Sequence, residues 1–198
     1  MKYQICVAGA TNRDGVKETN KIAYNIGRAI ALRGATLTTG ATIGLPHYAA
    51  MGANSIENRA GAVIGFSPAG SLREHVATYR LPTDEFDYIN FTGMQYIGRG
   101  IELIRSSDAL ILVGGRMGSL HELATALESR KVCGVLLESG GVADYTKTLV
   151  EYIETPAAKD ILYHTDPDQL VASVLRRLND KNSDILDDIG EMSSDDAE

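Results

Sequence analysis

The stretch from Asp108 to Glu122, with the sequence DALILVGGRMGSLHE, decides the fold of this chain. Its first part, residues 109–113, is an apolar run of β-strand character that stops at a glycine-rich turn, and a helix-starting signal follows at once. Such a junction directs backbone N–H groups and a helix N-terminus at one point, which suits a phosphate group. The same turn brings the cation Arg116 and the acid Glu122 to the rim of the crevice, so the stretch predicts a nucleotide site.

Elsewhere, short apolar runs alternate with longer segments of helical period, which is typical of a parallel sheet with crossover helices. Strands are predicted over residues 3–8, 36–38, 62–66, 88–91, 109–113, 132–137 and 161–163. Helices are predicted over residues 16–33, 45–60, 94–106, 120–130, 145–154 and 167–178, and residues 67–87 are predicted to be mostly loop with a short helical piece. The fold class is therefore α/β, a Rossmann-like, doubly wound, mostly parallel sheet flanked by helices.

The charge of the chain is concentrated at its C-terminal end. The 198 residues include 26 acidic and 19 basic side chains, of which eight acidic residues and one lysine lie in residues 180–198. The remaining residues carry 18 acidic and 18 basic groups, and such a neutral body argues against nucleic acid as a partner. We predict a single Rossmann-like nucleotide-binding domain over residues 1–179, followed by an acidic, disordered tail over residues 180–198.

The cysteines and the apolar segments of the chain indicate where in the cell the protein is expected. Cys6 and Cys133 each lie in an apolar, strand-like segment, and we expect them to be buried, reduced thiols. The first residues lack the apolar core of a signal peptide, and no apolar run approaches the roughly 18 residues needed to span a bilayer. These features predict a soluble, cytoplasmic protein without a membrane partner.

Three turns follow predicted strands, and in a doubly wound sheet the ligand lies beyond the carboxyl ends of the strands. The predicted phosphate- or nucleotide-binding residues in these turns are Gly9, Thr11, Gly40, Gly44, Gly114, Gly115, Arg116, Gly118 and Ser119. Glycines let a backbone approach an anion closely, and hydroxyl groups add hydrogen-bond donors. Ordinary turn chemistry explains the same residues, so this alternative stays open.

Glu122 also has a second interpretation. The segment Ser119-Leu120-His121-Glu122 fits a capping box, in which Ser119 and Glu122 satisfy each other's unpaired backbone donors. In that case Glu122 is a helix cap worth about 1 kcal/mol and nothing more. We expect His121 to face solvent or to pack locally rather than to act as a catalyst.

Arg99 lies in a predicted helix between Gly98 and Gly100. Each glycine costs a helix roughly 1 kcal/mol relative to alanine. The local weakness therefore indicates that another group closely approaches this surface.

The glycine turns, together with an arginine 23 residues ahead of a glutamate, resemble the LOG family, proteins once described as possible lysine decarboxylases. This family belongs to the wider SLOG group of Rossmann-like nucleotide binders. Its hallmark, Pro-Gly-Gly-x-Gly-Thr-x-x-Glu, falls without a gap on residues 114–122, and its upstream arginine falls on Arg99. Its earlier glycine loop falls on residues 39–47 and keeps Gly40 and Gly44. Here Gly114 replaces the proline, Arg116 replaces a glycine, and Ser119 replaces the threonine.

The resemblance implies a homodimer that hydrolyses the N-glycosidic bond of a nucleoside 5′-monophosphate to free base and ribose 5-phosphate. Glu122 and Arg99 would be the catalytic residues, and the glycine turns with Ser119 would hold the phosphate. It implies no cofactor, and the spacing of His and Cys suggests no metal. Two alternatives remain, a sensor or carrier that binds a nucleotide-like ligand without cleaving it, and a nucleic-acid binder.

Overall fold

The structure is a computed structural model that describes residues 2–11 and 17–185. Its centre is a parallel sheet of seven strands in the order β4-β3-β2-β1-β5-β6-β7. The strands are β1 (Gln4–Gly9), β2 (Thr36–Thr39), β3 (Val63–Ser67), β4 (Tyr88–Phe91), β5 (Ala109–Val113), β6 (Val132–Leu136) and β7 (Ile161–His164). The central strands are buried along their whole length, which explains why their sequences are continuously apolar.

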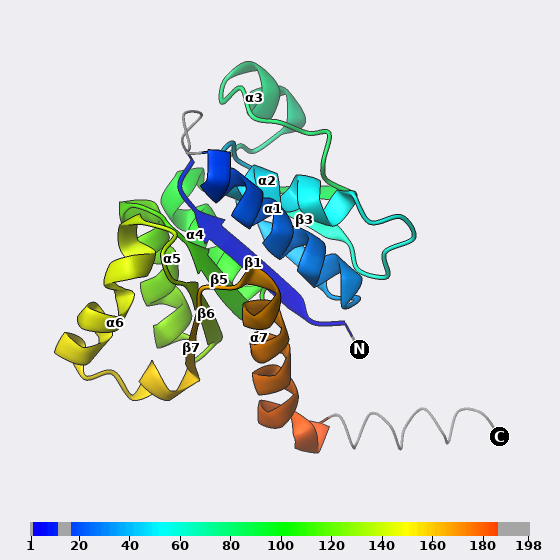
Figure 1. The fold of residues 1–198 in the computed structure, drawn as a ribbon. Coiled ribbons are helices and arrows are strands. Elements are labelled where there is room, and N and C mark those ends of the chain that lie inside the picture. Colours follow the sequence, from blue (N-terminus) through cyan, green and yellow to red (C-terminus); the bar gives the residue numbers. More distant parts are fainter. Residues whose placement is uncertain (1, 12–16, 186–198) are drawn as a thin grey trace.

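Helices cover both faces of the sheet, which gives three layers (Figure 1). They are α1 (Lys17–Leu32), α2 (Leu45–Asn54), α3 (Leu72–Ala77), α4 (Gln95–Arg105), α5 (Met117–Glu128), α6 (Gly141–Ile153) and α7 (Pro167–Lys181), with a short 3-10 helix at Pro156–Asp160. One core contains residues of α1, α2 and α7, whereas a second core contains residues of α4, α5 and α6. The predicted α/β, Rossmann-like class is confirmed.

The strand order reverses between β1 and β5. β1 pairs with β2 on one side and with β5 on the other, and Gly9 lies opposite Val113 at the carboxyl ends of β1 and β5. The loops that leave β1 and β5 therefore diverge at this point, which opens a crevice at the edge of the sheet.

Helices α1 and α2 pack closely because two glycines replace side chains at their contact. A Cβ atom at Gly27 would lie 1.8 Å from the carbonyl oxygen of Ala49, and one at Gly52 would lie 1.9 Å from that of Tyr24. Each glycine thus receives the backbone of the other helix, and no larger residue fits without separating the helices.

Several predicted helix bounds differ from the structure. Helix α2 ends at Asn54 rather than at residue 60, and Asn58 adopts a left-handed conformation with φ of 54°. Helix α6 begins at Gly141, four residues early, and α5 begins at Met117, three residues early. The short helical piece predicted within residues 67–87 is α3.

The predicted tail begins inside a helix. Residues 180 and 181 belong to α7, and residues 183–185 are also helical, so a disordered tail from residue 180 is wrong for this part. The predicted disorder of residues 186–198 falls outside the described residues.

Both cysteines are buried and free, as predicted. In the described part of the chain, no helix has the length and apolar character needed to cross a membrane.

Candidate functional site

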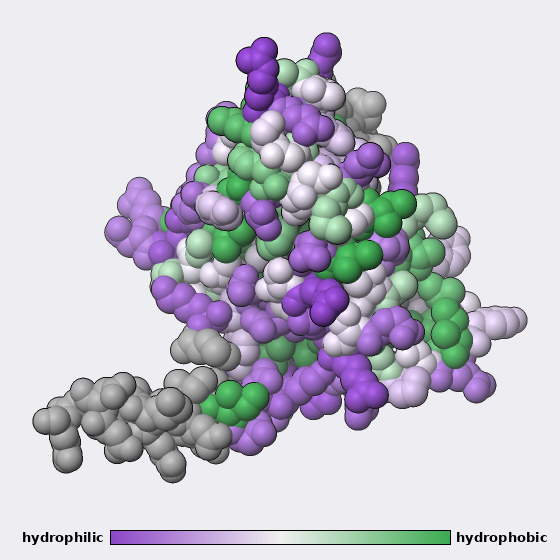
Figure 2. All heavy atoms as spheres, turned by 180° about the vertical axis from the view of Figure 1, so that it is seen from behind, coloured by the Kyte–Doolittle hydropathy of each residue, from purple (hydrophilic) through white to green (hydrophobic). Residues whose placement is uncertain are grey.

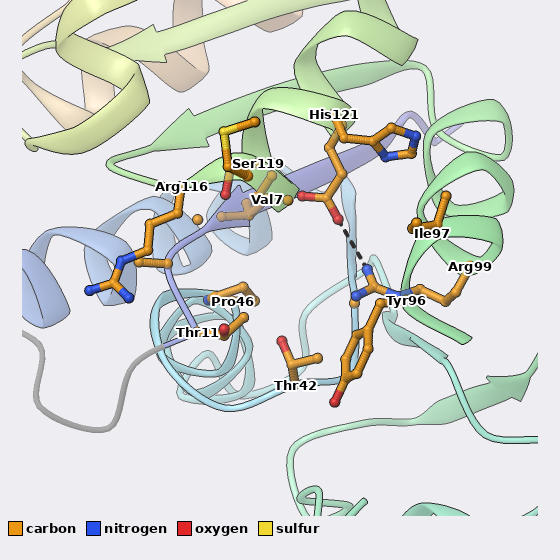
Figure 3. A pocket seen from close by; sticks show the side chains of 17 residues that line it. Val7, Thr11, Thr42, Pro46, Tyr96, Ile97, Arg99, Arg116, Ser119 and His121 are labelled. Atoms are coloured by element: carbon orange, nitrogen blue, oxygen red, sulfur yellow. Dashed lines mark hydrogen bonds and ion pairs between the residues drawn. The ribbon is translucent and has the colours of Figure 1, made fainter. Parts of the chain in front are cut away.

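A cavity of about 490 Å³ opens where the strand order reverses (Figure 3). Its lining comes from the end of β1, the loops after β1 and β2, helix α4 and the first turns of α5. Cavities of this size accept ligands as large as a nucleotide. The lining includes eight of the predicted site residues, Gly9, Thr11, Gly40, Arg99, Arg116, Gly118, Ser119 and Glu122.

The start of α5 faces the cavity. Arg116 is extended and precedes the helix, and Met117, Gly118 and Ser119 form its first turn and line the cavity. The first N–H groups of a helix have no partner within it and carry a partial positive charge. Because a Cβ at Gly118 would have no neighbour within 4 Å, the backbone there is accessible to a ligand.

Arg99 and Glu122 form an ion pair at the cavity wall. Arg99 Nη1 donates to Glu122 Oε1 over 3.1 Å, and the two side chains are only 6% and 13% exposed. Gly40 makes this possible, since a Cβ there would lie 2.3 Å from Arg99 Nη1. The close approach predicted at Gly98 and Gly100 takes a different form, because Gly100 faces His121 and Glu122 of α5, which a Cβ there would meet at ordinary contact distances of 3.5–3.7 Å.

Arg99 does not fully compensate the cost of burying the charge of Glu122. Burial raises the pKa of Glu122 above its ordinary value, although the charge and hydrogen bond of Arg99 and the charge of His121 oppose this rise. The buried Nε of Arg99 has no hydrogen-bond partner among the described residues. A carboxylate held in this way is a candidate for acid–base or electrostatic work on a ligand.

The capping-box interpretation of Glu122 is wrong. Ser119 lies inside the first turn of α5, and no side chain caps this helix. The carboxylate of Glu122 instead bonds Arg99 on the neighbouring helix α4.

Three predicted site residues, Gly44, Gly114 and Gly115, do not line the cavity. Gly44 has φ of 82° and lies against the backbone of Ala10 and Thr11, so it shapes the turn. The N–H of Gly114 donates to Ser139 Oγ over 2.8 Å, and the carbonyl groups of Gly114 and Gly115 accept from the first turn of α6. These two glycines join the loops after β5 and β6.

The cavity also has lining residues that were not predicted. They include Tyr96 and Ile97 on α4, Met117 and His121 on α5, and Pro46 on α2. His121 was expected to face solvent or to pack locally, and its imidazole contacts the cavity beside Ile97 (Figure 3). Within the described ranges, no group of three His, Cys, Asp or Glu side chains could hold a metal ion.

The chain belongs to the SLOG cluster4 family, whose model matches residues 2–171. A protein of Archaeoglobus fulgidus, described as uncharacterized, is 33% identical over 162 residues, which are 79% of this chain and 97% of that protein. The predicted resemblance to the SLOG group is confirmed.

Solved structures of binding proteins share this architecture. The molybdenum cofactor carrier protein of Chlamydomonas reinhardtii superposes with a TM-score of 0.71 at 27% identity, covering 90% of this chain and 99% of that chain. The molybdenum cofactor binding protein of Rippkaea orientalis superposes with a TM-score of 0.71 at 26% identity, covering 88% of this chain and 98% of that chain. DNA processing protein A of Helicobacter pylori superposes with a TM-score of 0.60 at 17% identity, covering 88% of this chain and 80% of that chain. This likeness shows a common fold alone.

Proposed function

We propose that this protein binds a phosphorylated, nucleotide-like small molecule in the cavity at the carboxyl ends of β1 and β5. The observation that carries the proposal is the convergence of the loop after β1, the loop after β2 and the first turn of α5 on one cavity of about 490 Å³. Free helical N–H groups, the hydroxyl of Ser119 and the guanidinium of Arg116 suit an anionic group. The SLOG fold, which is a nucleotide-binding fold, supports the same class of ligand.

We further propose that Glu122 and Arg99 hydrolyse the N-glycosidic bond of a bound nucleoside 5′-monophosphate. When the bond between C1′ and the base nitrogen breaks, its electrons leave with the base and positive charge develops on the sugar. Glu122 would stabilise this charge and accept a proton from the attacking water, whose oxygen bonds to C1′ and whose proton reaches the base. Arg99 would hold the carboxylate in place. The buried pair supports this role, since burying two charges is costly for folding.

A second candidate is a carrier that binds its ligand without cleaving it. The similarity to two molybdenum cofactor proteins over almost their whole length favours it. Arg116, which replaces a glycine of the LOG hallmark, adds a charge that suits a more anionic ligand.

Incubation with nucleoside mono-, di- and triphosphates, followed by chromatography for free base, tests hydrolysis. We expect release of base by the wild type and a loss of at least about 100-fold in Glu122→Gln and Arg99→Lys, because each removes charge or geometry from the reacting centre. Glu151→Gln, on the exposed surface of α6, is the matched control. If no base appears but one ligand or the molybdenum cofactor raises the melting temperature, the carrier is favoured and hydrolysis is rejected.

Gly118→Ala tests the phosphate side of the cavity. Alanine in the first turn of α5 should raise the free energy of unfolding by about 0.5 kcal/mol, because glycine is a poor helix former. The added methyl group enters the open space beside the free N–H groups, so we expect affinity for inorganic phosphate and AMP to fall about tenfold. Unchanged affinity in calorimetry would contradict a phosphate at this turn.

The homodimer and the lack of nucleic-acid binding remain proposals, as does the cytoplasmic location. Most apolar residues of α2 are buried within the chain, whereas on α5 Leu123 and Ala126 are buried and Met117 is exposed. The face opposite the view of Figure 1 shows separate hydrophobic patches among polar residues (Figure 2). Light scattering during gel filtration tests the dimer, and a gel shift at several salt concentrations tests nucleic-acid binding.

A further inference from the structure

We propose that the α4 side of the cavity is a ring-binding subsite, in which Tyr96, Ile97 and His121 receive the planar heterocycle of the ligand. This inference rests on the proposed binding of a phosphorylated ligand, and it adds the class of group at the other end of that ligand. The subsite would select a flat ring without reading its hydrogen-bonding edge.

The cavity has two chemically different sides (Figure 3). Thr11, Arg116 and Ser119 lie on the side of the glycine turns, whereas Tyr96 and Ile97 project from α4 on the other side. Glu122 on α5 lines the same cavity and accepts a hydrogen bond from Arg99 on α4. A ligand held by its phosphate at the glycine turns and extending past the carboxylate would reach the α4 side.

The α4 side exposes apolar surface that a ring would cover. Tyr96 is 52% exposed and Ile97 is 71% exposed, although both line a cavity. Large apolar side chains left open beside a pocket commonly mark a ligand surface. A flat heterocycle fits this surface because it stacks on an aromatic face and also contacts aliphatic side chains.

Tyr96 has contacts within the protein that orient its ring. Its ring makes an edge-to-face contact with Tyr79, with centroids 5.7 Å apart and planes at 77°. The preceding residue, Gln95, adopts a φ of 54°, and its N–H donates to the carbonyl of Pro68 over 3.0 Å. A left-handed non-glycine residue costs about 1 kcal/mol and persists where the surroundings enforce it. A ring held in place in this way loses little entropy when a ligand stacks on it.

Few polar groups on this side could identify a particular base. The side-chain groups able to hydrogen bond on this side include the imidazole of His121 and the hydroxyls of Tyr96 and of Thr42, which lies beside Tyr96 (Figure 3), while Arg99 and Glu122 bond each other. Stacking tolerates any base because every base has a π-face. We therefore expect AMP, GMP and IMP to bind within about fivefold of one another, and all of them to bind more tightly than ribose 5-phosphate.

Calorimetry with two probes tests the subsite. The first probe is ribose 5-phosphate, and the second is 9-deazaadenosine 5′-monophosphate, whose carbon–carbon glycosidic bond resists hydrolysis. The wild type should bind the second at least about tenfold more tightly. In Tyr96→Ala, the affinity for the nucleotide should fall about tenfold and the affinity for ribose 5-phosphate less than about twofold. Tyr145→Ala, on the exposed surface of α6, should change neither affinity.

A positioning variant adds a second measurement. Tyr79→Ala should lower the affinity for the nucleotide about threefold, because the ring of Tyr96 loses its edge-to-face contact. Tyr79→Phe keeps this contact and should retain wild-type affinity. Circular dichroism and melting temperature establish that each variant is folded.

The outcomes separate the two proposals. If ribose 5-phosphate and the nucleotide bind equally well, or if Tyr96→Ala weakens both to the same degree, the ring subsite is rejected while phosphate binding stands. If neither probe binds, the proposed function is rejected together with the subsite.

Discussion

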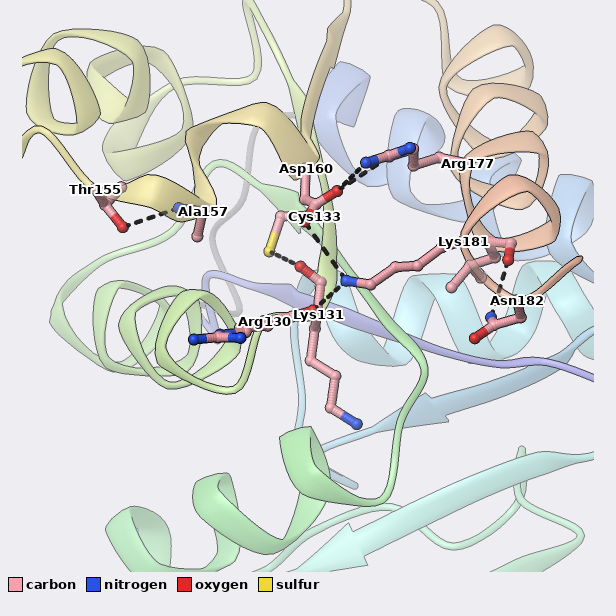
Figure 4. Close-up of polar contacts among 10 residues, drawn as sticks. Arg130, Lys131, Cys133, Thr155, Ala157, Asp160, Arg177, Lys181 and Asn182 are labelled. Atoms are coloured by element: carbon pink, nitrogen blue, oxygen red, sulfur yellow. Dashed lines mark hydrogen bonds and ion pairs between the residues drawn. The ribbon is translucent and has the colours of Figure 1, made fainter. Parts of the chain in front are cut away.

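Two buried carboxylates, Glu122 and Asp160, are held in opposite ways. Glu122 faces the cavity and accepts one hydrogen bond from Arg99 within the described structure. Asp160 lies at the end of the 3-10 helix, 6% exposed, and accepts two bonds from Arg177 at 2.6 and 3.0 Å (Figure 4). Lys181 approaches its other oxygen at 3.5 Å. Both cations belong to α7, so Asp160 fastens the last helix to the edge of the sheet.

The pKa values of the two carboxyl groups reflect this difference. Burial raises the pKa of both, but at Asp160 the hydrogen bonds and charges of Arg177 and Lys181 outweigh burial, so its pKa falls below the ordinary value. At Glu122 burial outweighs Arg99, and the pKa rises. Asp160 is therefore a satisfied structural group, whereas Glu122 remains incompletely compensated where a ligand would bind.

Replacing each carboxylate by its amide should change stability in opposite directions. Asp160→Asn leaves Arg177 and Lys181 without a countercharge, and we expect a loss of about 2 kcal/mol in the free energy of unfolding, reduced because both cations are partly exposed. Glu122→Gln also removes the countercharge of Arg99, but it should be at least as stable as the wild type at pH 7, because the raised pKa of Glu122 means that the cost of burying its charge outweighs its attraction to Arg99. Urea unfolding measures both.

The exposed pair of Arg33 and Asp168 provides the control, since Asp168→Asn should cost less than about 1 kcal/mol. Equal losses in Asp160→Asn and Glu122→Gln would contradict the proposed difference between Asp160 as a structural group and Glu122 as a candidate catalytic group.

The contributions of Glu122 and Asp160 to the free energy of unfolding should change with pH in opposite directions. Below its raised pKa, folded Glu122 binds more protons than the unfolded chain, so stability falls as the pH rises from 4.5 through that value. The advantage of Glu122→Gln should grow over this window. The lowered pKa of Asp160 stabilises the fold above pH 3.8, and this contribution is lost as the pH falls further. The stability curves of Asp160→Asn and wild type should therefore converge in acid, and parallel curves would contradict the assignment.

The thiol next to each carboxylate should be unreactive. Burial, with a contribution from Asp160, raises the pKa of Cys133 to about 12, and burial with a contribution from Glu122 raises that of Cys6. At pH 8 we expect a disulfide reagent to modify both thiols more than about 100-fold more slowly in the folded protein than in denatured protein. Fast modification of either thiol in the folded protein would show that its carboxylate lies in a more open region than described.

The strands were the most predictable part of the fold. Residues 88–91 and 109–113 were predicted with the bounds of β4 and β5, since turn residues flank short apolar runs. The start of α5 was missed because Ser119 looks like a helix cap, whereas Gly114 and Gly115, with φ of 56° and 100°, turn the chain early enough for the helix to begin at Met117.

The charged pair of the site was predictable, but its apolar side was not. Arg99 carried a local signal, the two flanking glycines, and Glu122 carried the motif. Tyr96 and Ile97 carry no such signal, because their place in the cavity depends on how α4 rotates over the sheet and on the hydrogen bonds that fix its first turn. The sequence also could not distinguish the roles of the glycines within one motif. Gly118 lines the cavity, whereas the N–H of Gly114 donates to Ser139.

The reciprocal glycine contact between α1 and α2 makes these helices a single mechanical unit. Gly27 and Gly52 each lie against the backbone of the other helix, so neither helix can slide or tilt alone without a steric clash. The loop after β2 leads into α2 and lines the cavity. A movement of α2 that displaced this wall of the cavity would therefore have to displace α1 as well.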